Sequence, residues 1–496
     1  MTSATECTRI REYRRPPRWR EIGGFSGSVL AVMIMFLWLV PGMALAQENE
    51  PSEEPASVEE PFEEPAAPEE DAGAASPTLI DGWRETLMFG LDSEVIELLS
   101  VLRDQRERRL FSEIAELFDQ SSNPRLRQRI LEFYATMEYP DGELAALSVI
   151  QAHREVPGDL LLAAIRYVSS AIENPQQETR AALREVAEGT QITAAETAIR
   201  ALGRRGGDDE IAPLVERLSD RRTSGPVRAA LILALGDLGA TEAVDELLRI
   251  AGDTVEESTT RQFAADSLGR IGDERAIPLL LELAVGSDTM LRAYAVNALG
   301  AFRGDEVERI VINSLRDSFW RVRVAALEAV ARHDLEAAIP AVQFRAQRDP
   351  EGRVRTEALS ALARMSDPRA RTFLHEFVLG ERNPEAMRIT ALQRLADADW
   401  GATIPLFEQI VEAEQRKPQS RMMDQVGRMV STSDEVVPNA VYEAFLDHPN
   451  FIMQIYGIRA VGRHSIRALR ERVAAMSEAP YHQAVRRIAT DALERM

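Results

Sequence analysis

From Leu79 onward, apolar and polar residues alternate with the spacing of amphipathic helices, and no strand-like alternation stands out. The pattern is clearest after a recurring arginine. Three, four and seven residues beyond Arg228 stand Leu231, Ile232 and Leu235, and the same offsets are apolar in other copies. Residues at these offsets share one face of a helix. The pattern therefore predicts a series of helices that each bury one apolar stripe.

The arginine and its surroundings repeat along the chain. Segments 227–239, 260–272 and 291–304 each carry an arginine, an Ala-rich apolar stretch, and Leu-Gly seven and eight residues after the arginine. If this arginine is the anchor of each copy, the copies are 33, 31, 31, 32, 33 and 33 residues apart, at Arg228, Arg261, Arg292, Arg323, Arg355, Arg388 and Arg421. Extended in both directions, the period gives about thirteen copies between Leu79 and Met496.

Each copy is predicted to hold two helices. The glycine eight residues after the anchor, as in Gly236, Gly269 and Gly300, is expected to end the anchor helix in a left-handed conformation. A turn then leads to a second amphipathic helix, such as 276–285, and a turn with an aspartate, such as Asp288, leads to the next anchor. One pair cannot cover both of its apolar stripes, so the copies must stack. The predicted fold is all-α.

The combination of an Asp-bearing turn, Val-Arg, an Ala-rich helix and Leu-Gly resembles HEAT repeats, particularly the bacterial type related to phycobilisome-lyase repeats. The resemblance covers residues 79–496 and is clearest over 195–400, whereas copies before 195 and over 421–496 depart from it. Tetratricopeptide repeats fit less well, because their spaced Trp, Gly and Tyr signature is missing. The resemblance implies an α-solenoid of about thirteen stacked antiparallel helix pairs, a HEAT-like superhelix.

The resemblance also implies a structural role for the anchor arginines. In HEAT arrays this arginine reaches the aspartate of a neighbouring turn, and such pairs form a ladder along the stack. The alternative is that the arginines bind an anion. We favour the ladder, because partly buried ion pairs fix register more than they add affinity. The ladder is assigned to Arg228, Arg261, Arg292, Arg323, Arg355 and Arg388.

The N-terminal region has a different pattern. Basic residues up to Arg20 precede an apolar run at 29–40, and small residues at 44–46 follow it. This order predicts a signal peptide over 1–46, which would deliver the body to the periplasm or cell envelope. The alternative is an uncleaved anchor in the inner membrane with the body outside the cytoplasm, and only then would the protein contact the membrane. Residues 47–78, rich in proline and glutamate, are predicted to be a disordered acidic linker.

Charge and cysteine content restrict the partners. The formal net charge is −22, with eleven carboxylates and no basic residue between Glu48 and Asp71, and the repeats carry about −14. A body this acidic repels phosphate backbones, so nucleic acid is not an expected partner. The single cysteine, Cys7, lies in the predicted signal peptide, so no disulfide is expected in the mature chain.

No group of residues in the sequence indicates a catalytic centre. The six histidines fall in different repeats without three- or four-residue spacing, whereas metal sites need three or four converging ligands. The HEAT-repeat deoxyhypusine hydroxylases hold a metal centre with several His-Glu pairs, but His375-Glu376 is the only such dipeptide here. Nucleophile-elbow, phosphate-loop and dinucleotide fingerprints are missing. We therefore expect no catalytic residue, metal or cofactor; a HEAT-fold lyase or hydroxylase is the alternative.

The remaining hypothesis is a binding surface. In a HEAT stack the anchor helix lines the concave face, and positions two and five residues after the anchor point away from the core. Polar residues flanked by aromatics there suit a protein or peptide partner, although a solvated face is equally consistent. Phe319-Trp320 is more typical of a packing wedge. We expect a non-enzymatic exported scaffold whose candidate partner-binding residues are Phe263, Asp266, Tyr294, Asn297, Glu328, Ser360, Gln393 and Tyr456.

Overall fold

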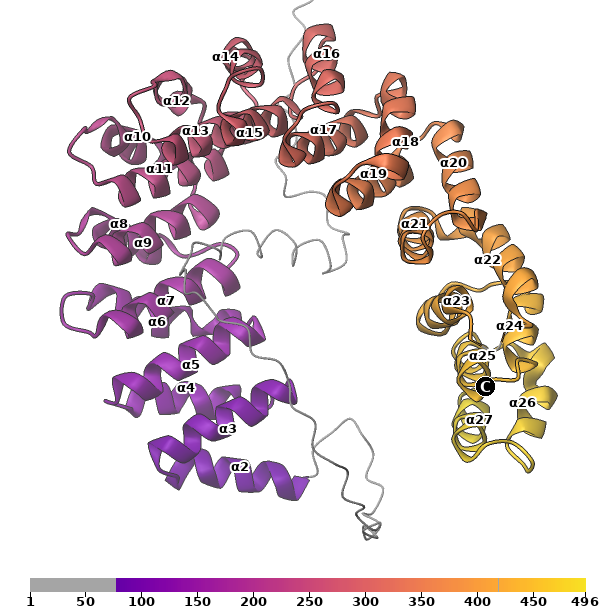
Figure 1. The fold of residues 1–496 in the computed structure, drawn as a ribbon. Coiled ribbons are helices and arrows are strands. Elements are labelled where there is room, and N and C mark those ends of the chain that lie inside the picture. Colours follow the sequence, from indigo (N-terminus) through magenta and orange to yellow (C-terminus); the bar gives the residue numbers. More distant parts are fainter. Residues whose placement is uncertain (1–76, 418) are drawn as a thin grey trace, which may run out of the picture. The chain divides into compact units, whose positions relative to one another are not determined.

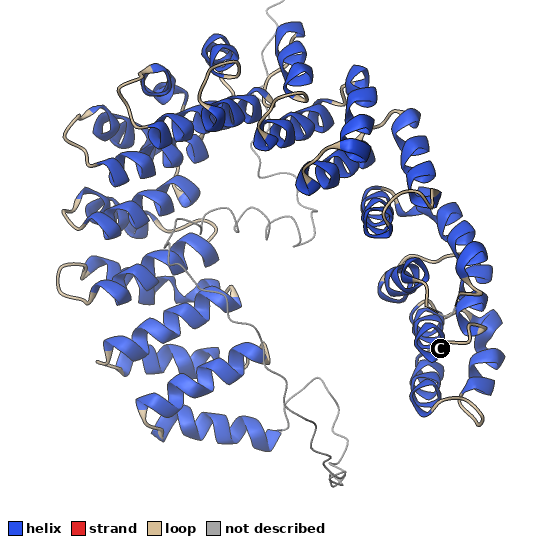
Figure 2. Ribbon diagram, in the orientation of Figure 1, coloured by secondary structure: helices blue, strands red, loops and turns tan. Residues whose placement is uncertain are grey.

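The computed structural model describes residues 77–417 and 419–496. Across these two ranges the chain forms 26 α-helices and no strand (Figure 2). The predicted all-α solenoid is confirmed, and its helices make thirteen consecutive pairs. The first helix begins at Pro77, two residues before the expected start of the repeats. The predicted signal peptide, and the predicted linker up to residue 76, lie outside the described residues.

The helices alternate between two layers, and the odd-numbered layer is the inner one in Figure 1. The even-numbered helices are α2 (Pro77–Phe89), α4 (Phe111–Gln120), α6 (Glu143–Gln151), α8 (Gln177–Glu188), α10 (Ile211–Ser219), α12 (Val244–Gly252), α14 (Ile277–Leu283), α16 (Asp305–Ser314), α18 (Ile339–Arg348), α20 (Pro368–Leu379), α22 (Trp400–Glu414), α24 (Asn439–Leu446) and α26 (Arg470–Met476).

The odd-numbered helices contain the anchor positions and pack side by side along the stack. They are α3 (Asp92–Asp104), α5 (Pro124–Met137), α7 (Gly158–Ala171), α9 (Ile192–Arg205), α11 (Gly225–Leu238), α13 (Ser258–Ile271), α15 (Thr289–Leu299), α17 (Trp320–His333), α19 (Gly352–Arg364), α21 (Glu385–Ala398), α23 (Arg421–Thr432), α25 (Phe451–Arg463) and α27 (Gln483–Arg495). Within the described residues, no helix is sufficiently long and apolar to cross a bilayer.

Aspartates in the turns start the odd-numbered helices. The Asp288 carboxylate accepts hydrogen bonds from the backbone N–H groups of Met290 and Leu291, both at 3.0 Å. These donors have no partner within the helix, so the side chain that caps them stabilises the first turn. Asp317 and Asp349 accept from the N–H groups of Phe319 and Glu351, which directly precede α17 and α19, and so shape the turn before each helix. The aspartate that the sequence pattern contains is therefore a turn and cap residue.

The predicted apolar stripe forms the core. Leu231, Ile232 and Leu235 of α11 are fully buried, as are the equivalent positions of the neighbouring helices. Burying one such side chain stabilises the fold by about 1.5–3 kcal/mol. Many buried residues of α9 to α19 are alanines, whose small side chains let neighbouring helices come close together.

The expectation that the glycine at the eighth position ends the helix in a left-handed conformation is wrong for all three glycines. Gly236 and Gly269 lie inside α11 and α13, and the left-handed residues are Gly239 and Gly272, three positions later. Gly300 follows α15 directly and is right-handed, with φ of −62°. The chain therefore ends α11 and α13 with a glycine that the repeat pattern did not single out.

The eighth-position glycine instead lets neighbouring odd-numbered helices approach each other. A Cβ atom on Gly269 would lie 2.6 Å from the Cα of Ala298 in α15, and one on Gly236 would lie 2.8 Å from the Cβ of Ser267 in α13. Both distances are well below van der Waals contact, so only glycine fits without a backbone shift. The glycine thus fixes the spacing between successive repeats.

Aromatic packing replaces the Ala-rich pattern in the first repeats. The rings of Phe111 and Tyr139 lie 4.2 Å apart between centroids, and those of Tyr134 and Tyr167 lie 6.0 Å apart. The Tyr167 hydroxyl donates a hydrogen bond to the Tyr139 carbonyl oxygen at 2.6 Å. These repeats keep the helix-pair geometry with a different set of core residues, which is why the sequence pattern weakens before residue 195.

Candidate partner-binding face

The six assigned ladder arginines all bind a backbone carbonyl at or near the end of the preceding even-numbered helix. For Arg228, Arg261 and Arg388 the oxygen belongs to the residue ten positions earlier, at 3.0, 3.0 and 2.6 Å. For the other three it belongs to the residue six positions earlier, at 2.6–2.9 Å. A cation there satisfies carbonyls that lack a helical partner and complements the helix dipole. This capping role was not part of the sequence prediction.

Three of the six also reach a carboxylate in the following turn. Arg323 binds Asp349 through two hydrogen bonds of 2.8 and 2.6 Å, and Arg292 binds Asp317 through two of 3.1 Å. Arg228 donates to Glu256 at 3.1 Å. Within the described residues, the other three arginines make no ion pair within 4 Å. The carboxylates of the ladder are thus committed to arginines.

The pair between Arg323 and Asp349 is the most deeply buried of these ion pairs. The side chain of Arg323 is 6% exposed and that of Asp349 is 0% exposed. Burial acts to raise the pKa of Asp349, but the hydrogen bonds from Arg323 and from the Glu351 backbone hold this pKa below its usual range. Asp349 is therefore a charged structural residue.

All eight candidate partner-binding residues lie on odd-numbered helices and are half-buried. We call the exposed side of this layer the odd-helix face. Five of them occupy the fifth position after the anchor on five adjacent helices, α13 to α21. In α23 the fifth position is Val426, which is buried, so Tyr456 in α25 is separated from the others.

The first group of candidates lies on α13 and α15. Asp266 forms an ion pair of 2.9 Å with Arg270, which also bonds to Asp237 on α11. Burial raises the pKa of Asp266, and the nearby arginine opposes this rise. Burial also raises the pKa of Tyr294, and the charge of Asp266 adds to that shift. Asp266 and Tyr294 therefore belong to one polar network, together with Asn297, which hydrogen-bonds to Asp266.

The second group lies on α17 and α19 and includes a residue that the sequence analysis missed. The repeat pattern did not single out Glu357, yet its carboxylate accepts a hydrogen bond of 2.6 Å from Arg364. Burial raises its pKa to about 7, with Arg364 lowering it and the charge of Glu328 raising it. Burial likewise raises the pKa of Glu328. Glu357 stands two residues after its anchor, the offset of Phe263 and Tyr294, and this offset could have identified it.

Glu357 makes stability depend on pH. Its folded pKa is above the usual value, so the folded state binds the proton more tightly and stability falls as pH rises from about 4.5 to about 7. We expect Glu357→Gln to match the wild type at pH 4.5 and to be more stable at pH 8 by on the order of 2 kcal/mol. Urea unfolding followed by circular dichroism measures this difference. As a control, Glu306→Gln at an exposed carboxylate of α16 should leave the dependence of unfolding free energy on pH unchanged. If the profile of Glu357→Gln ran parallel to that of the wild type, Glu357 would not be the source of the pH dependence.

Tyr456 belongs to a separate contact between α23 and α25. Its hydroxyl lies 3.3 Å from an oxygen of Asp424, and its ring packs directly over Gly427. A Cβ on Gly427 would lie 2.6 Å from the ring, so this glycine makes room for the tyrosine. Much of the Tyr456 side chain is therefore used in packing between repeats.

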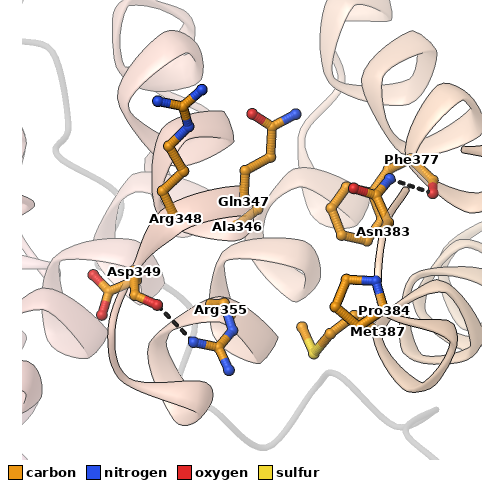
Figure 3. Close-up of a pocket in the computed structure, with 9 residues that line it drawn as sticks. All are labelled: Ala346, Gln347, Arg348, Asp349, Arg355, Phe377, Asn383, Pro384 and Met387. Atoms are coloured by element: carbon orange, nitrogen blue, oxygen red, sulfur yellow. Dashed lines mark hydrogen bonds between the residues drawn. The ribbon is translucent and has the colours of Figure 1, made fainter. Parts of the chain in front are cut away.

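A pocket of about 260 Å³ lies where α18 and α19 meet α20 and α21 (Figure 3). Of its lining residues, Arg355 donates a hydrogen bond to the Asp349 carbonyl at 2.6 Å, and Asn383 donates one to the Phe377 carbonyl at 2.8 Å. The Asp349 carboxylate is bound to Arg323 and is not free to act as a base. Its lining residues include no histidine, cysteine, serine or threonine.

Two histidines bridge neighbouring parts of the array. In His333 one ring nitrogen lies 2.8 Å from the Gly300 carbonyl, and in His464 one lies 2.6 Å from the Tyr442 hydroxyl. Within residues 77–417 and 419–496, no three His, Cys, Asp or Glu side chains are placed to hold a metal ion together.

Comparison with known proteins identifies the repeat type. A family model described as Spirochaete HEAT repeat protein matches residues 87–492. Among curated proteins, none is similar to the chain at the sequence level.

Solved structures with similar folds share little sequence with the chain. Human deoxyhypusine hydroxylase is 17% identical, with 54% of this chain and 99% of that chain covered and a TM-score of 0.25. The phycocyanin lyase complex of CpcE and CpcF from Nostoc sp. PCC7120 is 17% identical, with 57% of this chain and 92% of that chain covered and a TM-score of 0.29. Kap121p bound to Pho4p is 12% identical, with 85% of this chain and 50% of that chain covered and a TM-score of 0.35. The chain thus spans half of that protein. Similarity at these levels carries no argument about function.

Proposed function

Since the chain belongs to the Spirochaete HEAT repeat protein family, we propose that it is a non-enzymatic scaffold that binds a protein or peptide along its odd-helix face. One observation carries this proposal. Five adjacent helices place a half-buried polar residue at the same repeat position, namely Asp266, Asn297, Glu328, Ser360 and Gln393. A row of this kind can contact an extended partner at regular intervals along several repeats.

The half-burial of these side chains supports binding over a merely solvated face. Groups that are already partly desolvated and held in place lose less side-chain entropy when a partner covers them. Asp266 is held by Arg270, and the buried surroundings of Glu328 strengthen its electrostatic interactions. The row therefore supplies pre-positioned polar contacts.

Site-specific photo-crosslinking in the native cell tests the proposed face. A photoreactive amino acid at Asn297, Ser360 or Gln393 is expected to capture the same partner, because all three lie on the odd-helix face. Arg309 in α16 and Glu408 in α22 are exposed positions of the even-numbered layer and serve as controls. The product bands are identified by mass spectrometry.

The pattern of crosslinks decides the outcome. Capture of one protein from the three odd-helix positions, with little from the two controls, supports the proposal. Equal capture from both layers, or capture only from the even-numbered layer, rules this face out. Unchanged thermal unfolding of each variant shows that the fold is intact.

We also propose that the protein is exported, with its body in the periplasm or cell envelope. The support is the order of basic, apolar and small residues over 1–46. N-terminal sequencing of the mature protein separates the two forms of this proposal. A start at Gln47 indicates cleavage, whereas an intact N-terminus indicates a membrane anchor. Recovery of the protein from the cytoplasmic fraction would contradict both.

A further inference from the structure

Trp320, at the start of α17, has two arginines stacked over its ring. The guanidinium carbon of Arg321 lies 5.2 Å from the ring centroid and that of Arg353, at the start of α19, lies 5.3 Å away. The other two tryptophans in the described residues are used differently: Trp83 is in the core and Trp400 packs on Phe407. The Arg-Trp-Arg group is thus a specific arrangement across two neighbouring repeats.

Within the described residues, neither arginine has a carboxylate within 4 Å. An N–H group of Arg321 lies 3.6 Å from the sulfur of Met290, and Arg353 is exposed. By contrast, the nearby Arg323, Arg345 and Arg355 each bind a carboxylate or a carbonyl oxygen. Stacking on an aromatic ring uses the face of the guanidinium and leaves its N–H donors for another acceptor.

The surroundings of this group are locally basic. Residues 316–355 contain eight arginines and six carboxylates, a net charge of +2 in a chain whose net charge is −22. Tyr294, one of the candidate partner-binding residues, lies close enough to Arg321 for its charge to lower the pKa of the tyrosine, although burial raises that pKa overall. The Arg-Trp-Arg group therefore adjoins the odd-helix face and differs from it in charge.

We propose that Arg321, Trp320 and Arg353 form a docking point for a carboxylate-rich peptide segment. Two guanidiniums held on one ring match carboxylates on an extended chain, and charge-assisted hydrogen bonds to carboxylates are among the strongest in proteins. The tryptophan adds an apolar surface for the peptide backbone or side chains. This inference rests on the proposed function, because it assigns one chemical class to part of the partner.

A peptide fits better than a polyanionic surface. The net charge of the repeats is strongly negative, so a membrane of anionic lipid or a nucleic acid would be repelled over most of the area that it covers. A short acidic segment can contact two arginines without facing the rest of that charge. At physiological ionic strength, salt screens exposed charges that are more than about 8 Å apart. The distant negative charges of the repeats therefore weaken such a local contact little.

Fluorescence anisotropy with the full-length chain tests the proposal. The probe is a labelled octaglutamate peptide, with an octaglutamine peptide, phosphatidylglycerol vesicles and single-stranded oligothymidine as competitors or alternative ligands. We expect octaglutamate to bind, octaglutamine not to bind, and R321Q/R353Q to weaken octaglutamate binding about tenfold or more. The matched control is R129Q/R309Q, which removes two exposed arginines from α5 and α16 and the same total charge.

Each result either supports or overturns the docking point. Loss of binding in R321Q/R353Q with retention in R129Q/R309Q supports it, and W320A should then also weaken binding. Equal weakening in both double variants, absence of octaglutamate binding, or tighter binding of vesicles or oligothymidine overturns it. Far-ultraviolet circular dichroism establishes that the variants fold. If the docking point fails while crosslinking still maps a partner to Asn297, Ser360 and Gln393, the proposed function stands without it.

Discussion

Arg323→Ala is expected to destabilise the protein by about 3–5 kcal/mol, the largest effect of any single substitution considered for this chain. The reason is that the Asp349 carboxylate is fully buried and would lose its bidentate partner, with the single hydrogen bond of 3.2 Å from Arg345 remaining. The change also removes two hydrogen bonds from Arg323 to carbonyls in the turn before α17. Urea unfolding monitored by circular dichroism measures the loss.

The matched control for this prediction is Arg309→Ala. Arg309 also pairs with a carboxylate, Glu306, at 3.1 Å, but both side chains are 65% exposed. Exposed pairs of this kind contribute about 0–1 kcal/mol, so the control should unfold close to the wild type. A second variant, Arg323→Ala with Asp349→Asn, removes the buried charge and should recover part of the stability. Similar destabilisation by Arg323→Ala and Arg309→Ala would contradict the structural role of the buried pair.

Gly269→Ala is expected to destabilise the protein by about 1–2 kcal/mol. The new methyl group would stand 2.6 Å from the Cα of Ala298, and α13 and α15 would have to separate to admit it. Such overpacking costs about 1–3 kcal/mol, and the better helix propensity of alanine returns at most about 1 kcal/mol. The urea midpoint of the variant measures the difference.

Gly82→Ala provides the comparison, because Gly82 also lies inside a helix but has no atom near its missing Cβ. This variant should be as stable as the wild type or gain up to about 1 kcal/mol from helix propensity. Opposite effects of the same substitution at the two sites would show that the distance between helices determines the sign. A Gly269→Ala variant that is as stable as Gly82→Ala would mean that α13 and α15 can move apart freely.

Much of the fold could be predicted from the sequence because one period controls both the core and the turns. Leu231, Ile232 and Leu235 are buried for the reason that their spacing indicates, and Asp288 starts a helix as its place in the repeat suggests. The glycine at the eighth position could not be assigned correctly in this way. A recurring glycine fits a helix end or a close helix contact equally well, and only the distance from Gly269 to Ala298 decides between them.

The candidate face could be predicted only in outline. The helical period identifies which offsets face outward, and Asp266 and Glu328 do lie there, half-buried. It does not reveal that Arg270 links Asp237 to Asp266, since that contact joins residues from successive repeats. The same limit applies to Trp320, whose two arginine neighbours come from α17 and α19. Contacts between repeats depend on how the helices stack, and a linear pattern does not contain this information.

The ion pairs between an anchor arginine and the following turn end at Asp349. Arg355 and Arg388 bind only carbonyls within their own repeats, and the pocket of Figure 3 lies at this same junction of α18 and α19 with α20 and α21. Opening the stack at this junction breaks no buried charge pair of this type, whereas opening it between α17 and α19 would hydrate Arg323 and Asp349 separately. In a repeat array, stability is a sum over neighbouring units. Separating the helices after α19 would therefore expose apolar surface without dividing a buried ion pair of this kind, as would separating them after α13, where Arg261 binds only a carbonyl oxygen.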